Sequence, residues 1–572
     1  MIKARAEAAQ QLLDRMARGT LDRRAFLKLA AAMGVAVLLD PGQTEQALAA
    51  GQTQLANRQA VKDSYDYVIV GAGAAGCIVA ARLADAGADV LLVESGGSDD
   101  LPQVTTPGLW FTNIGGPLDW KFHAAPSPDV NNRAVPLAMG HVLGGGTSIN
   151  AMLWVRGVAQ DYDDWAQQGC DGWRFSDVLP VFKEIEDWEG GANQWRGAGG
   201  PLQIGTAHAP HPTAAAFVDA ARQMDIPILD DMNGPMREGA GYANMSINRD
   251  GSRASAARAF LRPVLGRPNL TLLLNTDAVR LLFKGSRCTG IALHGADGVR
   301  NVAARREIIV TAGGIASAKL LLLSGIGDAD DARRAGITPT VDLKGVGRNF
   351  QDHPLLFGVA LRYKGKFPPR SMTSNAVEAA ALVRSDSAVN RPDVMMVLQQ
   401  VSAVTPEIRA AFGAAPENGF VISPALVRPT SRGRYQLTSA DWRQAGRLDA
   451  GFLATERDLE ATARCIDLCR DLGRQHGFDP VRAAEAIPGR SLGKAALRDF
   501  ARNATISFGH PVGTCKMGID EMAVVDSQLR VHGVEGLRVC DSSIMPSIVT
   551  GPTSAASHMI GAKAAHMILG TA

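Results

Sequence analysis

His510 begins the string His510-Pro-Val-Gly-Thr-Cys-Lys-Met-Gly518, the segment of the chain richest in chemically useful residue types. Histidine titrates near neutral pH, so it can take a proton from an alcohol. The proline that follows favours extended or turn backbone at this histidine. A lone histidine is more often an ordinary surface or core residue, and the hypothesis of a catalytic base therefore depends on its surroundings.

The segment after this string predicts a ligand site. A strand is expected over residues 537–540 and ends at Asp541, and Gly551-Pro-Thr-Ser554 then opens a helix that runs to about residue 569. The end of a strand followed by the start of a helix is where open α/β sheets bind ligands. Proline fits the first helical turn, and the positive end of the helix suits negative charge.

A dinucleotide-binding unit is predicted upstream. Residues 65–70 have the pattern of a buried strand, Gly71-Ala-Gly-Ala-Ala-Gly76 follows, residues 77–86 favour a helix, and a second strand over 90–93 ends at Glu94. Such glycines let the backbone approach a pyrophosphate, the helix offers free N–H groups, and the acid accepts hydrogen bonds from ribose hydroxyls. This unit alone does not separate FAD from NAD.

Later segments indicate a divided architecture. Gly140-His-Val-Leu-Gly-Gly-Gly-Thr-Ser-Ile-Asn150 is a backbone-donor loop suited to phosphate or a flavin edge, with a plain glycine hinge as the alternative. Strands over 270–274, 279–283 and 307–311 and a helix over 316–323 are expected to return to the first domain. Candidate strands over 392–399 and 419–426 and a helix over 456–475 predict an antiparallel domain that roofs a pocket.

Composition limits the function classes. The chain has 572 residues, and its 59 basic and 57 acidic side chains leave a net charge of +2. Such balance gives no global drive toward nucleic acid or anionic membrane. The seven cysteines are scattered without zinc-site spacing, so we expect no metal site and interpret them as small buried apolar residues.

The first 50 residues resemble an export leader. Arg23-Arg24 with Phe26 and Leu27 precedes an apolar run over 29–39, and small residues occupy 47–50. This layout is that of a twin-arginine signal, with an amphipathic helix or a membrane anchor as alternatives. The run is shorter than the roughly 20 residues that span a bilayer. We expect cleavage near Ala49 or Ala50, a periplasmic or exported protein, and no transmembrane segment in its mature form.

Together these strings resemble the glucose–methanol–choline (GMC) flavoprotein oxidoreductases. The similarity runs from about residue 65 to 569 and includes Gly345-Val-Gly-Arg-Asn-Phe-Gln-Asp-His-Pro354. It implies an α/β fold, with a Rossmann-like FAD-binding domain assembled from separated segments and a substrate domain built on an antiparallel sheet. The expected segments are a leader at 1–50, FAD-binding segments at 64–155, 245–350 and 501–572, a loop-rich lid at 156–244 and a substrate domain at 351–500.

The resemblance also implies a mechanism and a set of site residues. His510 accepts the hydroxyl proton of a small-molecule alcohol, and hydride passes to flavin N5, which gives an aldehyde or ketone. The expected FAD-binding residues are Gly71, Gly73, Ala74, Ala75, Gly76, Glu94, Gly144, Gly145, Thr147, Ser148, Asn150, Ala151, Met152, Val279, Ala312, Gly313, Asp541, Pro552, Thr553 and Ala555.

Four positions depart from the family pattern. His141 stands where arginine or lysine is usual, and Ala318 stands where proline is usual. Ile149 occupies the place of the histidine that carries covalent FAD in some members, which favours non-covalent FAD. Ser554 occupies the position of the second active-site residue, usually histidine or asparagine; serine cannot act as a base at neutral pH. His558, Asn503 or Thr553 are candidate substitutes.

Several functional alternatives follow from these departures. The expected activity is alcohol oxidation, with a dehydrogenase favoured over an oxidase and with a quinone, a cytochrome or oxygen as electron acceptor. The altered Ser554 keeps open a redox-silent or unusual use of the fold, such as a hydroxynitrile lyase or a fatty-acid photodecarboxylase, and a non-enzymatic flavin-binding protein is the third hypothesis. Leu355, Leu356, Phe357, Met395, Met396 and Val397 favour a partly apolar pocket and an aliphatic or aromatic alcohol over a sugar.

Overall fold

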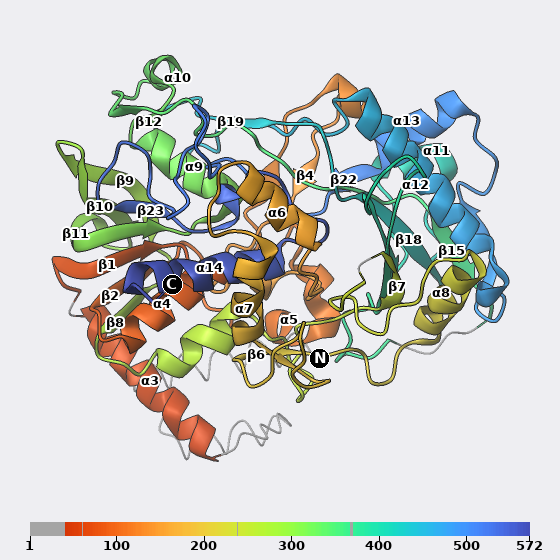
Figure 1. Ribbon diagram of the computed structural model, residues 1–572, viewed down its shortest axis with the longest axis horizontal. Coiled ribbons are helices and arrows are strands. Elements are labelled where there is room, and N and C mark those ends of the chain that lie inside the picture. Colours follow the sequence, from red (N-terminus) through yellow and green to blue (C-terminus); the bar gives the residue numbers. More distant parts are fainter. Residues whose placement is uncertain (1–40, 60, 237, 366–369, 572) are drawn as a thin grey trace.

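Two sheets organise the molecule, and in the computed structural model they lie side by side (Figure 1). The structure describes residues 41–59, 61–236, 238–365 and 370–571, so the paired arginines and the apolar run of the expected leader lie outside the described residues. The first sheet has the order β8-β2-β1-β11-β10-β9, with β23 against β11. Its strands are β1 (Ser64–Val70), β2 (Val90–Val93), β8 (Leu270–Leu273), β9 (Asp277–Lys284), β10 (Arg287–Gly295), β11 (Gly298–Val310) and β23 (Leu537–Val539).

The first sheet forms because its central strands meet through buried apolar segments, such as residues 68–70 of β1 and residues 308–310 of β11. β1, β2, β8, β11 and β23 pair in parallel, and β2 is buried at every residue. A parallel strand covered on both faces has this continuous apolar pattern. The strands expected at 279–283 and 307–311 are parts of longer strands, since β9, β10 and β11 form one antiparallel meander.

The second sheet is antiparallel and has the order β21-β15-β18-β17-β16-β7. It contains β15 (Ala360–Tyr363), β16 (Ala379–Val383), β17 (Val394–Gln399), β18 (Gly419–Leu426) and β21 (Arg482–Ile487) from the expected substrate domain. β7 (Gly239–Tyr242) joins from the preceding segment, and β22 (Thr505–Ser507) pairs with β14 (Pro354–Leu356). The antiparallel sheet is thus confirmed, and strands from before and after residues 351–500 complete it.

Helices cover both sheets. α4 (Ala74–Asp85) and α14 (Ser554–Leu569) pack together beside the first sheet, and a Cβ at Gly561 would lie 2.5 Å from Cα of Ala75. α9 (Gly313–Leu323) packs on β9, and α12 (Glu456–Arg474) lies on β18 of the second sheet, with α13 (Lys494–Ala504) beside it. Besides α3, the other α-helices of the described residues are α5 (Pro102–Thr105), α6 (Ala159–Gln167), α7 (Phe175–Ile185), α8 (Pro212–Gln223), α10 (Ala329–Arg334) and α11 (Pro406–Phe412).

α3 (Pro41–Gln59) joins the expected leader to the folded body. The amide of Gln54 donates to the carbonyl oxygens of Leu265 and Leu270 at 2.7 and 2.8 Å, so the C-terminal part of α3 is fixed beside β8. The cleavage expected at Ala49 or Ala50 falls within this helix. In the described part of the chain, no helix combines the length and apolar character needed to cross a membrane.

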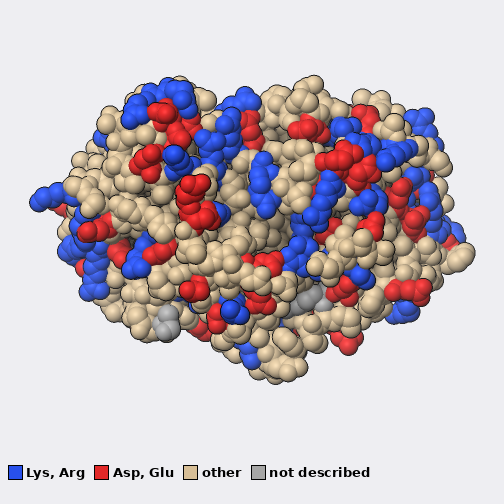
Figure 2. Space-filling model, turned by 45° about the horizontal axis from the view of Figure 1, so that its top comes forward, with Lys and Arg blue, Asp and Glu red and all other residues tan. Residues whose placement is uncertain are grey.

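Acidic and basic side chains alternate over the surface. Figure 2 shows both signs interspersed on the face that it draws, as the 59 basic and 57 acidic residues of the chain suggest. The field around such a surface is weak beyond the Debye length, about 8 Å at physiological salt.

Candidate functional site

A cavity of about 830 Å³ lies between the two sheets and collects most of the predicted site residues. His510 and Ser554 line it. So do these predicted FAD-binding residues: Gly71, Gly73, Ala74, Ala75, Glu94, Gly145, Thr147, Asn150, Ala151, Met152, Ala312, Gly313, Asp541, Pro552 and Thr553. Gly71 and Ser554, which are 483 positions apart, therefore share one site, as the divided architecture predicts.

Two walls of this cavity differ in origin. We name as the flavin wall the lining residues within 70–95, 138–153, 276–323 and 541–557, which belong to the first sheet and its loops. We name as the substrate wall the lining residues within 107–114, 355–403 and 506–508, which come from strands of the second sheet and from loops. His510 lies where the two walls meet.

Five predicted residues support the flavin wall without lining the cavity. A Cβ at Gly76 would lie 1.9 Å from the carbonyl oxygen of Gly71, so α4 packs against the glycine turn at a distance that only glycine allows. Gly144 has φ +87°, and the Ser148 hydroxyl donates to the carbonyl of Leu143 at 2.6 Å. Ala555 is buried in α14, and on β9 Ala278, the neighbour of Val279, lines the cavity.

The flavin wall fits a pyrophosphate. Gly73, the N-cap of α4, makes no capping hydrogen bond with a side chain, so the first N–H groups of this helix remain available to a ligand. A Cβ at Gly71 would lie 2.6 Å from the carbonyl oxygen of Thr311, and a Cβ at Gly145 would lie 2.9 Å from Cα of Gly73. The two glycine loops therefore touch through backbone, and together they form a cradle that side chains would fill.

Glu94 fits the ribose at the end of β2. Its carboxylate accepts hydrogen bonds from the backbone N–H groups of Ala72, at 2.9 Å, and Gly96, at 2.8 Å. Burial raises the pKa of Glu94 to about 7, and these two hydrogen bonds oppose the rise. Carboxylate oxygens have further lone pairs, so Glu94 can still accept from ribose hydroxyls.

Asp541 connects the C-terminal segment to the first domain through hydrogen bonds. It accepts hydrogen bonds from the backbone N–H of Gly313, at 2.8 Å, and of Ser543, at 2.8 Å, and from the Ser317 hydroxyl. Burial raises the pKa of this carboxyl. Asp541 thus fixes the end of β23 against the start of α9 at the cavity edge.

His510 is placed by the pairing of β14 with β22. In this pair Pro354 opposes Ser507, so His353, just before β14, lies beside the turn that carries His510. Nδ1 of His353 and Nδ1 of His510 are 3.0 Å apart, and Asp352 accepts from the backbone N–H of His510 at 3.0 Å. His353 belongs to the motif at 345–354, but its contact with His510 was not predicted, because only the strand register creates it.

This contact constrains the protons of the two rings. Nδ1 of one ring donates and Nδ1 of the other accepts. Nε2 of His353 is buried and has no hydrogen-bond partner among the described residues. When Nδ1 of His353 is the acceptor, Nε2 of His510 carries the lone pair that a base requires.

Burial keeps both rings neutral. It lowers the pKa of His510 to about 3, and it lowers the pKa of His353 well below the usual value, with the neighbouring His510 acting in the same direction. A neutral histidine with a free Nε2 is the form that accepts a proton.

The comparisons with known proteins agree with this geometry. Residues 65–355 and 429–561 match the N-terminal and C-terminal family profiles described as GMC oxidoreductase. The chain belongs to the GMC oxidoreductase family. It is 38% identical over 530 residues to the oxygen-dependent choline dehydrogenase of Brucella ovis, a match that covers 88% of this chain and 95% of that protein.

Further relatives extend the comparison. The mitochondrial choline dehydrogenase of Homo sapiens is 36% identical over 544 residues, which are 89% of this chain and 90% of that protein. The crystal structure of pyridoxine 4-oxidase from Mesorbium loti superposes with a TM-score of 0.84 at 32% identity and covers 88% of this chain and 99% of that one. This GMC protein is therefore an FAD-dependent oxidoreductase that acts on the CH–OH group of an alcohol.

Ser554 begins α14 and lines the cavity of this GMC protein. Its candidate substitutes behave differently. Nδ1 of His558 lies 2.7 Å from the carbonyl oxygen of Ser554, and the ring is buried against Trp154, 5.3 Å away between centroids. Asn503 bonds to Asn131 at 2.9 Å, outside the cavity lining, whereas Thr553 lines the cavity next to Ser554. His558 and Asn503 therefore do not replace the family's second active-site residue.

The remaining departures have structural explanations. His141 stacks on Trp120 with ring centroids 4.1 Å apart, and burial lowers the pKa of His141. Ala318 is fully buried inside α9, where it fits without a proline. Ile149 lines the cavity and has no group that could bond to a flavin.

The substrate wall corrects the apolar pocket expected from the sequence. Leu355, Phe357 and Val397 line the cavity, but Leu356, Met395 and Met396 are buried in the core instead. Successive residues of a strand face opposite sides of the sheet, which explains Leu356 and Met396. Trp110, Phe111 and Phe508, which the sequence analysis did not select, line the cavity.

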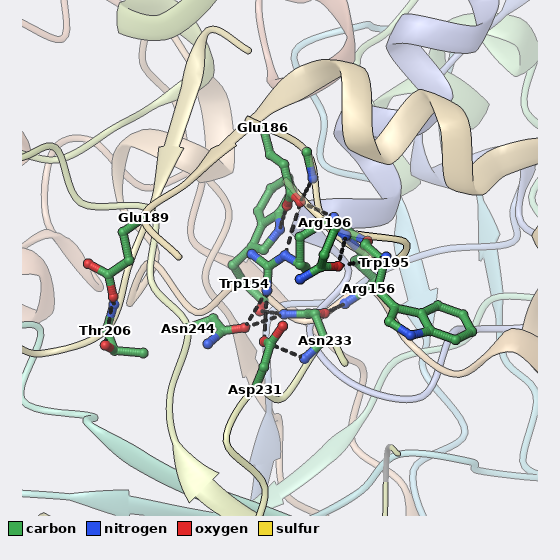
Figure 3. A network of polar contacts seen from close by, with 12 residues as sticks. Trp154, Arg156, Glu186, Glu189, Trp195, Arg196, Thr206, Asp231, Asn233 and Asn244 are labelled. Atoms are coloured by element: carbon green, nitrogen blue, oxygen red, sulfur yellow. Dashed lines mark hydrogen bonds and ion pairs between the residues drawn. The ribbon is translucent and has the colours of Figure 1, made fainter. Parts of the chain in front are cut away.

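A buried polar network holds the chain that leaves the 138–153 loop. Figure 3 shows Glu186 between Arg156 and Arg196, and all three side chains are fully buried. Arg196 also donates to Asp231 at 2.8 Å, and the amide of Asn233 donates to the carbonyl of Trp154 at 2.8 Å. Because buried ion pairs must be matched in charge, this network fixes residues 154–156 directly beside the flavin wall.

Proposed function

We propose that His510 is the base of this alcohol oxidation, that FAD is held without a covalent bond, and that the enzyme is a dehydrogenase. The observation that carries the proposal is the pair of buried histidines at the junction of the two walls, whose Nδ1 atoms lie 3.0 Å apart. In the tautomer that we propose, Nδ1 of His510 donates to His353 and Nε2 of His510 accepts the proton of the alcohol. Ile149 at the position of covalent attachment supports non-covalent FAD.

Different residues of the chain have different roles in the reaction. Nε2 of His510 accepts the hydroxyl proton while His353 keeps the ring oriented through Nδ1. Bound FAD supplies the acceptor for the hydride that leaves the alcohol carbon. Hydride leaves an alkoxide-like oxygen more readily than a neutral hydroxyl, so a positioned base contributes about 10²–10⁴-fold.

Ser554 and Thr553 provide further hydrogen-bonding groups for the substrate oxygen. Both lie at the start of α14 and line the cavity, and Ser554 is partly exposed to it. A serine hydroxyl can donate one hydrogen bond to the substrate oxygen but cannot take its proton at neutral pH. One base therefore suffices in this enzyme.

An anaerobic titration tests the proposed function. Purified protein with its FAD is mixed with a panel of primary and secondary alcohols, and the flavin absorbance near ~450 nm is followed, because the redox chemistry belongs to the cofactor. We expect at least one alcohol class to bleach the flavin, and slow return of the band in air would support a dehydrogenase. A flavin band that no alcohol bleaches would contradict alcohol oxidation and favour the lyase or photodecarboxylase alternative.

We also propose export by the twin-arginine route, with a quinone or cytochrome as electron acceptor. All seven cysteines are buried and free, which supports folding in a reducing compartment before export. Lysine substitutions at Arg23 and Arg24 should retain the protein in the cytoplasm of a bacterial host, as cell fractionation can measure. Lysine at Arg15 and Arg18 is the matched control and should leave export unchanged; equal fractions for both variants would contradict the proposal.

A further inference from the structure

We propose that the cavity selects an uncharged alcohol with an apolar body and discriminates against quaternary ammonium alcohols such as choline. This inference deepens the proposed function and rests on it. It departs from the curated relatives, whose names state that they act on choline.

The charges around the cavity carry the inference. Its described lining contains three carboxylates, Glu94, Asp277 and Asp541, and all three belong to the flavin wall. Glu94 and Asp541 are engaged by backbone N–H groups of that wall. Arg370 is the charged residue among the described lining of the substrate wall, and its charge is positive.

Two carboxylates that come just before strands of the second sheet, Glu378 before β16 and Asp352 before β14, do not line the cavity. Glu378, which does not line it, accepts from the backbone N–H of His211 and from the side chains of Ser374 and Gln400. Asp352 accepts from Ser507 and from the backbone of His510, and burial raises its pKa to about 7. Neither group can balance a permanent cation on the substrate.

Two of the four aromatic side chains in the described lining of the substrate wall, Phe111 and Phe508, already pack against other groups. The guanidinium carbon of Arg370 lies 5.5 Å from the centre of the Phe111 ring, so Phe111 already makes a cation–π contact with Arg370. Phe508 stacks against His510 with ring centroids 4.4 Å apart. A cation moved from water into an apolar cavity without a partner loses its hydration without compensation.

The mouth of the cavity is apolar as well. Phe111 is 40% exposed and Ile114 46%, and both line the cavity; Met372, 50% exposed, lies beside them. The backbone N–H of Gly108 donates to the carbonyl of Met372 at 2.8 Å, which joins the two segments into one rim. Val397 and Leu355 continue this surface inward. Apolar groups thus extend from the rim toward His510, beside Gln399, Ser402 and Ser507 and the guanidinium of Arg370.

A pair of isosteric alcohols tests the inference on the FAD-loaded enzyme. Choline and 3,3-dimethylbutan-1-ol have the same shape, but choline carries a quaternary nitrogen where the second alcohol carries carbon. We expect the second-order rate of anaerobic flavin reduction to be at least 100-fold higher with 3,3-dimethylbutan-1-ol. An equal or higher rate with choline would overturn the inference and leave alcohol oxidation intact, whereas no reduction by any alcohol of the panel would overturn both.

One substitution gives an independent check. Gln399 lines the substrate wall and is of nearly the same size as glutamate, so Gln399→Glu adds a carboxylate with little change in volume. We expect the ratio of the two reduction rates, 3,3-dimethylbutan-1-ol over choline, to fall by tenfold or more in this variant. Thr373→Glu, which adds the same charge at an exposed position, is the matched control and should leave the ratio unchanged. An unchanged ratio in Gln399→Glu with retained FAD would contradict the inference.

Discussion

The flavin wall is built from backbone, whereas the substrate wall is built from side chains. On the flavin wall, Gly71 and Gly145 bring loops within van der Waals distance of other backbone, and peptide N–H groups bond to Glu94 and Asp541. On the substrate wall, Trp110, Phe357 and Val397 present aromatic and aliphatic groups from three separate segments. The difference shows why one wall can serve a fixed cofactor while the other can change with the substrate.

The two walls also differ in charge. The flavin wall contains the three carboxylates of the described lining, and the substrate wall contains Arg370. His510 lies between them in a setting that lowers its pKa to about 3. Burial of His510 therefore keeps the ring unprotonated before the substrate binds.

The largest effect is expected from the network that fixes the chain beside the flavin wall. Glu186→Gln leaves the buried Arg156 and Arg196 without a full countercharge and should lower the free energy of unfolding by about 3–5 kcal/mol. Asp219→Asn, which breaks an exposed pair with Arg222, is the control and should change stability by about 1 kcal/mol or less. Urea unfolding measures both, and equal effects would show that the network does not brace this wall.

The backbone construction of the flavin wall can be broken at one glycine. Gly145 has φ +54°, and a Cβ there would lie 2.9 Å from Cα of Gly73, so Gly145→Val should separate the two loops and release FAD. Gly285 in the turn between β9 and β10 has φ +62° and no atom within 4 Å of an added Cβ, and it does not line the cavity, so Gly285→Val is the matched control and should retain FAD. The FAD content of the purified variants measures the effect. Full FAD content in Gly145→Val would contradict the backbone cradle.

A smaller effect is expected on the substrate wall. Phe111→Ala removes an apolar contact at the rim and should raise KM for an apolar alcohol up to about tenfold, because burying such a side chain contributes about 1.5–3 kcal/mol when complete. FAD content should not change. Ile519→Ala, at a residue that is 79% exposed and does not line the cavity, should leave KM unchanged. A loss of FAD in Phe111→Ala would show that the two walls are not separable.

The contrast between the walls also explains what the sequence could predict. The strand at 65–70 and the turn Gly71–Gly76 are local signals, and the structure has β1 and the start of α4 there. By contrast, β7 and β22 are short strands of four and three residues, and their membership in the second sheet depends on partners more than 130 residues away. The domain boundaries given for the sequence stay a prediction.

The site residues also differ in whether local sequence or tertiary packing reveals them. His510 could be selected because its own string is distinctive, but its partner His353 is fixed by the register of β14 with β22. The apolar residues of the substrate wall could not be separated from core, since Val397 and Met396 are neighbours on one strand and face opposite sides. Arg370 and Phe111 meet only through the packing of distant loops.

The most direct test is the rate of anaerobic flavin reduction measured against pH for the wild type and for His510→Ala. With an alcohol that the enzyme oxidises, the wild-type rate should stay level as the pH falls through 6.5, because a lowered pKa keeps His510 unprotonated there. His510→Ala should retain FAD, lose about 10²–10⁴-fold in rate and become faster as the pH rises, since solvent must then remove the proton. Equal rates for the two proteins, or a wild-type rate that falls tenfold per pH unit below 6.5, would contradict a neutral, buried His510 as the base.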